Sequence, residues 1–278
     1  MQIRRSLRDR YTFILSITVY LILIFNILAL YVVLSQNLLA VAQIPFYVIA
    51  LPFAFVEFLP VHYEYYWVSF LVIVILISFA LSSLDFYRYA KNENERFGKL
   101  TELLILTISI TYLTYFISLF VTSQQNPFGN PIGNTPPNYV ILSLLHAPVY
   151  EELVYRVLLL GIPAFIIDYF YYGKKIPFYR AFTGGKFEMN KGTVTFLFIS
   201  AFFFGSAHLI SWEPAKFPSA FFAGLVLGYL FLRYGVYMSI TMHFIIDFSG
   251  TYSYINEPVW NIITIFLAII LLIWFVAG

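Results

Sequence analysis

Two adjacent acids, Glu151 and Glu152, lie in a stretch that otherwise has the composition of a membrane-buried helix, and Arg156 follows in the same stretch. An ionisable side chain near the centre of a bilayer costs about 2.5–3.5 kcal/mol on insertion scales. Residues four apart share a helix face, so Glu152 and Arg156 are placed to form an ion pair that lowers this cost. Glu151 is rotated by about 100° from Glu152 and can point elsewhere. These three charges mark the first place to look for chemistry.

Later apolar stretches add Phe204 with His208 and, further on, His243 with Asp247, each pair four residues apart. A tightly packed bundle could bring these groups and Glu151 around one cavity. The chemistry that this set supports is activation of water. A carboxylate acts as general base and a histidine beside it holds the same water. A second histidine donates to the developing oxyanion, a contribution of about 10²–10³ in rate in known cases.

The elements that must position these groups are membrane-spanning helices. Apolar residues make up 61% of the 278 and charged residues 11%, whereas soluble domains carry about 25% charged residues. The basic residues gather at the ends of apolar stretches and form no patch for nucleic acid. The chain has no cysteine, so thiolate catalysis and cysteine-ligated zinc are excluded. We therefore expect one all-α integral membrane domain over 1–278, with a catalytic core at about 139–250 and lipid around it.

A spanning helix needs about 20 mostly apolar residues. Gly224 and Gly228 form a small-xxx-small pattern that lets two such helices approach closely. The sequence predicts about eight transmembrane helices, at 11–35, 68–84, 100–121, 139–165, 193–210, 218–232, 237–249 and 259–276.

The apolar stretch 39–59 is ambiguous, because it contains Pro45 and Pro52 and proline interrupts a helix. Four basic segments fall on one side of the membrane only if this stretch does not cross fully. We expect it to be re-entrant or interfacial, with nine spans as the main alternative. Both termini then face the cytoplasm.

The ionisable positions resemble the motifs of a known family, the CAAX-protease and bacteriocin-processing (CPBP, or Abi) family. Glu-Glu-Leu-Val-Tyr-Arg at 151–156 resembles its EExxxR motif, 204–208 its FxxxH motif, and 243–247 its HxxxN/D motif. Each motif alone is weak, but all three occur in order and each within an expected span. The resemblance covers about 139–250 and implies an intramembrane endoprotease related to the type II CAAX prenyl endopeptidases.

The resemblance also implies roles for the residues. Glu151 would activate water with the help of His208, and His243 with Asp247 would form the oxyanion site. Glu152 and Arg156 would be a structural pair, and Phe204 of the FxxxH motif would be a structural or supporting residue. The family pattern often has asparagine at the position of Asp247, and an ionised aspartate repels an oxyanion. Asp247 is then protonated, orients His243, or marks a different class of substrate.

The glutamate-protease mechanism needs no metal or cofactor, and the expected substrate is a prenylated or other membrane-associated protein or peptide. One alternative is a zinc-dependent membrane metalloprotease with Glu151, His208, His243 and Asp247 as ligands, since three or four such ligands suffice for catalytic zinc. Another is a non-enzymatic immunity or transport protein whose buried acids and histidines relay protons. The sequence identifies neither the true substrate nor the oligomeric state.

Overall fold

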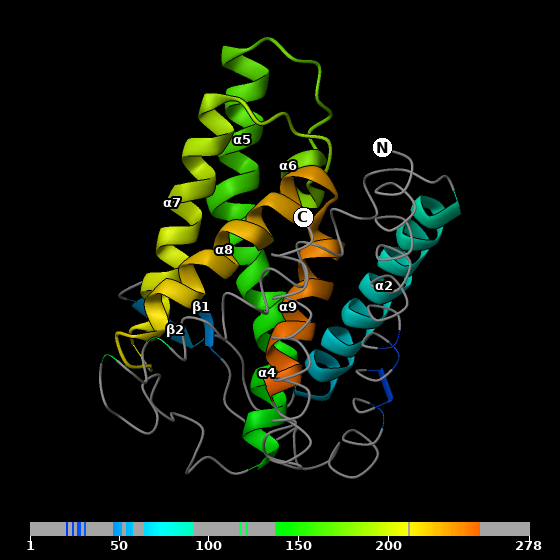
Figure 1. The fold of residues 1–278 in the computed structure, drawn as a ribbon, viewed down its shortest axis with the longest axis vertical. Coiled ribbons are helices and arrows are strands. Elements are labelled where there is room, and N and C mark those ends of the chain that lie inside the picture. The colour runs from blue at the N-terminus through cyan, green and yellow to red at the C-terminus, as the bar shows by residue number, and fades with distance from the viewer. Residues whose placement is uncertain are drawn as a thin grey trace, which may run out of the picture.

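The computed structural model describes residues 47–51, 54–57, 64–91, 137–210 and 212–250, together with single helical positions at 21, 24, 27, 28, 31, 117 and 121. Outside one pair of strands, the elements in these ranges are helices (Figure 1). They are α2 (Glu64–Lys91), α4 (Pro137–Glu151), η2 (Glu152–Gly161), α5 (Ile162–Ile166), η3 (Ile167–Tyr171), α6 (Arg180–Thr183), α7 (Lys191–His208), α8 (Lys216–Arg233) and α9 (Val236–Gly250).

Residues 47–57 depart from the all-α expectation. Strands β1 (Tyr47–Leu51) and β2 (Ala54–Glu57) pair antiparallel, with Leu51 opposite Ala54 and Tyr47 opposite Glu57. The purely helical class is therefore wrong for this stretch. Its sequence gives a physical reason, because Pro52 stands between the strands and proline disrupts a continuous helix.

Two helices of the described ranges are long and apolar enough to cross a membrane, over Val68–Asp85 and Ser143–Tyr171. α2 carries apolar residues all round: Leu71 and Ile75 are fully buried, whereas Ile73 and Ile77 are each 54% exposed. Such a helix suits a lipid environment on its outer side.

The structure describes some of the other expected spans as helices and leaves others outside the described residues. Those at 193–210, 218–232 and 237–249 correspond to α7, α8 and α9. The expected spans 11–35 and 100–121 are described only at single helical positions, and 259–276 lies outside the described residues. The number of eight spans stays a prediction, as does the cytoplasmic side of both termini.

Helices α7 and α8 pack closely because glycines lie at their contact. A Cβ built on Gly228 would lie 2.4 Å from Cδ1 of Leu197, and one on Gly224 would lie 3.0 Å from Cα of Ala201. The small-residue pattern of α8 therefore lies against α7, as its spacing predicts. This contact sets the position of α7, whose last residue is His208.

Helix α9 is held against α2 by polar as well as apolar contacts, and the two helices run side by side in Figure 1. The hydroxyls of Ser82 and Thr241 are 2.9 Å apart in the buried interface. Tyr237 donates a hydrogen bond to Asp85 one turn further along. Because His243 belongs to α9, these contacts with α2 help to fix the position of His243.

The loop before α7 is fixed by Asp168, which is fully buried. Its Oδ1 accepts hydrogen bonds from Lys174 (3.2 Å) and from the side-chain amide of Asn190. Desolvation lowers the pKa of Lys174, but hydrogen bonds to Glu188 and Asp168 outweigh it and raise this pKa above its ordinary value. Asn190 in turn caps α7 by accepting from the Thr193 backbone N–H at 3.0 Å.

Candidate active site

The two adjacent acids lie where the helix geometry changes. Glu151 is the last residue of α4 and Glu152 the first of the π-helix η2. Pro148 lies within α4, one turn earlier, and has no N–H to donate. The five-residue hydrogen bonds of a π-helix continue to the end of η2, where the N–H of Ile162 donates to the carbonyl of Val157. π-Helical turns are rare and occur often at functional sites.

Glu152 is fully buried, and both of its carboxylate oxygens have polar partners. Its Oε2 lies 3.2 Å from Nε of Arg156 and accepts a hydrogen bond from the hydroxyl of Ser239. Its Oε1 lies 2.8 Å from Nδ1 of His243. The carboxylate therefore links η2 to α9, and a buried charge of this kind needs such partners to be tolerated.

Arg156 is also fully buried and contacts Ser200 and Phe204 as well as Glu152. Its Nη1 donates to the hydroxyl of Ser200 at 3.3 Å, and that hydroxyl donates to the carbonyl of Tyr155 at 2.6 Å. The guanidinium carbon lies 4.6 Å from the centre of the Phe204 ring. Phe204 thus adds a cation–π contact to the ion pair.

His243 lies between carboxylates on both sides of its ring. Nδ1 faces Glu152, whereas Nε2 lies 3.2 Å from Oδ2 of Asp247 and 3.7 Å from Oε2 of Glu151. This arrangement fits an imidazolium, which donates at both nitrogens. The Phe204 ring meets the imidazole edge-on at 5.6 Å between centroids. His243 is therefore fixed at Nδ1 and presents Nε2 to the remaining two acids.

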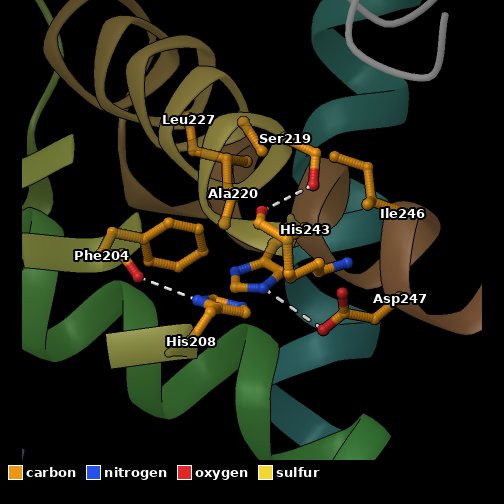
Figure 2. Close-up of a pocket in the computed structure, with 10 residues that line it drawn as sticks. Phe204, His208, Ser219, Ala220, Leu227, His243, Ile246 and Asp247 are labelled. Atoms are coloured by element: carbon orange, nitrogen blue, oxygen red, sulfur yellow. Dashed lines mark hydrogen bonds and ion pairs between the residues drawn. The ribbon is translucent and has the colours of Figure 1, made fainter. Parts of the chain in front are cut away.

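His208 approaches from the end of α7. Its Nδ1 donates to the carbonyl of Phe204 at 2.8 Å, one turn back. In a neutral ring this leaves Nε2 as a hydrogen-bond acceptor. Figure 2 shows His208 beside His243 and Phe204 at one wall of a pocket.

The pocket is a small cavity of about 40 Å³. A cavity holds a water when it offers about 10–15 Å³ or more and has polar partners. Its lining residues are Phe204, His208, Lys216, Ser219, Ala220, Ala223, Leu227, His243, Ile246 and Asp247. Three of the four expected catalytic residues therefore share one cavity. The fourth, Glu151, does not line the cavity, but its Oε2 lies 3.7 Å from Nε2 of His243, which does. This buried Oε2 has no hydrogen-bond partner among the described residues.

Sequence reasoning missed several residues of this site. Lys216 falls two residues before the expected start of its span at 218, where it counts as a loop charge. Ser239 and Ser200 are small hydroxyl residues in apolar helices, and no local pattern distinguishes them from packing residues. The four-residue spacings predicted which groups share a helix face, but not which groups meet across helices.

A metal site of protein side chains is not formed in the described part of the chain, where no three His, Asp or Glu side chains are grouped to hold an ion. The zinc alternative therefore has no preformed ligand set in these residues. It remains a hypothesis that a chelator experiment can test.

Residues 134–249 match the family model of the type II CAAX prenyl endopeptidase Rce1-like proteins. The match spans all three motifs and confirms the resemblance to the CPBP family. The matched family consists of integral membrane proteases, and the match over 134–249 supports a membrane hydrolase at the family level. No curated protein and no solved structure matches the chain.

Proposed function

We propose that this chain is an intramembrane endopeptidase that hydrolyses a peptide bond near the C-terminus of a prenylated CAAX-type substrate. The observation that carries the proposal is the approach of Glu151 and Asp247 to Nε2 of His243 beside a water-sized cavity. The family match supports this class of reaction and of substrate. The individual roles below follow from the contacts.

In this mechanism Glu151 is the general base. Its Oε2 takes a proton from a water in the cavity, and Nε2 of His208 accepts the second hydrogen bond of that water and orients it. The oxygen attacks the carbonyl carbon of the scissile bond to form a tetrahedral intermediate. Glu151 then returns the proton to the leaving nitrogen as the C–N bond breaks, so no proton is gained or lost.

His243 stabilises the negative charge of that intermediate. Its Nε2–H is held toward the cavity by the contact of Nδ1 with Glu152. The substrate oxygen takes the position at Nε2 that Asp247 occupies in the resting site. Asp247 accordingly orients His243 and holds the proton on Nε2 until the substrate oxygen replaces it there, and it does not touch the oxyanion. This role avoids the repulsion that an ionised aspartate at the oxyanion would cause.

The test is cleavage of a fluorogenic farnesylated CAAX peptide by purified protein. Glu151→Gln and His208→Gln should each lower kcat by about 10²–10⁴. Glu213→Gln, at an exposed acid before α8, is the matched control and should keep full activity. Cleavage that survives Glu151→Gln would contradict the role of the base.

The same assay with 1,10-phenanthroline separates the metal alternative. Cleavage that the chelator abolishes and zinc restores would replace the glutamate mechanism with a metalloprotease that uses Glu151, His208, His243 and Asp247 as ligands. Failure of the wild type to cleave would remove CAAX processing as the function, and would leave proteolysis of other membrane substrates or a non-enzymatic immunity or transport role.

A further inference from the structure

Lys216 lies in the wall of the same cavity as His208, His243 and Asp247. It is the first residue of α8 and is half-buried, while its neighbours Glu213 and Pro218 are exposed. Its ammonium nitrogen lies 4.8 Å from the ring centre of Trp212, a cation–π contact that orients it. The lysine therefore stands between the surface and the cavity.

Helix stability does not account for a lysine at this position. The N-terminus of a helix is the positive end of its dipole, where a cation is unfavourable. The first turn of α8 has no acidic residue to offset it. The ammonium also interacts electrostatically with Asp247 and Glu151, the two acids that face Nε2 of His243.

The two long basic side chains near the cavity, Arg156 and Lys216, differ in their partners. Arg156 forms an ion pair with Glu152, the acid that contacts Nδ1 of His243. Lys216 lines the cavity together with His243, whose two ring nitrogens already face carboxylates. A substrate that carries an anion close to its scissile bond would meet this ammonium.

We propose, on the basis of the proposed function, that Lys216 binds the free α-carboxylate at the C-terminus of the substrate. A peptide cleaved near its C-terminus places that carboxylate a few residues beyond the scissile bond, about 10 Å away for three extended residues. Lysine binds a carboxylate as a point charge through charge-assisted hydrogen bonds. Anchoring the carboxylate fixes which bond reaches Glu151 and His243, so Lys216 is a specificity residue.

The experiment compares two prenylated peptides that differ only in a C-terminal acid or amide. Wild type should favour the acid by about ten- to hundredfold in kcat/KM, the range expected for a hydrogen bond to a charged group. Lys216→Gln should bring the ratio of the two close to one, and Lys216→Arg should keep most of it. Lys191→Gln is the matched control, because Lys191 is likewise the first residue of an 18-residue helix. It is exposed and lies at the end of α7 opposite His208, so the ratio should not change.

A wild type that cleaves acid and amide peptides equally would overturn the inference and leave the proposed function standing. If the wild type cleaves neither, the proposed function fails, and binding decides the inference separately. The tripeptide product is then titrated as acid and as amide into Glu151→Gln protein, with and without Lys216→Gln. Preference for the acid that Lys216→Gln removes supports the carboxylate site, and equal binding overturns it.

Discussion

The neighbouring acids Glu151 and Glu152 should respond in opposite ways to the same substitution. Glutamine in place of Glu152 leaves the Arg156 guanidinium buried without a carboxylate, and loss of one partner of a buried pair costs about 3–5 kcal/mol. At about 2–4 °C per kcal/mol for domains of 150–250 residues, this lowers Tm by about 6–20 °C. Glu151 is 26% exposed and its Oε2 makes no hydrogen bond to a described residue. Glu151→Gln should therefore cost less than about 1 kcal/mol.

Activity should change in the reverse order. Glu151→Gln removes the general base and should lower kcat by about 10²–10⁴ while the protein melts like wild type. Thermal unfolding in one detergent and peptide cleavage at one temperature, measured on the same preparations, provide both values. The reasoning is refuted if Glu152→Gln melts within about 1 °C of wild type, or if Glu151→Gln is the less stable of the two.

Two other pairs of positions give matched comparisons. Gly184→Ala should destabilise by more than about 2 kcal/mol, because Gly184 has φ 68° and ψ −160° and a Cβ there would lie 2.5 Å from the carbonyl oxygen of Phe231. Gly173→Ala, at φ 64° where a built Cβ has no atom of the described residues within 4 Å, should cost only about 1–2 kcal/mol, and equal melting temperatures for the two would contradict this account. Ser82→Ala and Thr241→Val should each cost about 1–3 kcal/mol by leaving one buried hydroxyl unpaired, and the double variant should cost less than the sum. Additive losses in a double-mutant cycle would show that this contact does not couple α2 to α9.

Spacing along one helix predicted much of the site. The four-residue interval between Glu152 and Arg156 places them on one face, and they lie 3.2 Å apart. His243 and Asp247 share a face in the same way and also lie 3.2 Å apart. These contacts are local, so residue type and periodicity are enough to anticipate them.

Contacts between helices were less accessible to sequence reasoning. The hydrogen bond from Ser239 to Glu152 depends on how α9 packs against η2, and a serine in an apolar helix has several possible partners. To predict Lys216 one would need to know that α8 begins at this residue. A hydropathy pattern assigns it to the preceding loop because lysine is polar. The strands at 47–57 were missed because a short apolar run fits a strand and a helix segment equally well.

The two adjacent acids face the two different ring nitrogens of His243. Glu152 contacts Nδ1 of His243 with one oxygen, and its other oxygen pairs with Arg156 and accepts a hydrogen bond from Ser239, so its carboxylate fixes the ring at Nδ1. Glu151, rotated by about 100° on the same helix, reaches the other nitrogen at 3.7 Å, a distance that leaves it without a full hydrogen bond. A single acid could not both hold the ring and remain available to a water. In the proposed mechanism, two adjacent positions on one helical stretch therefore separate a structural charge from a reactive one without a further helix.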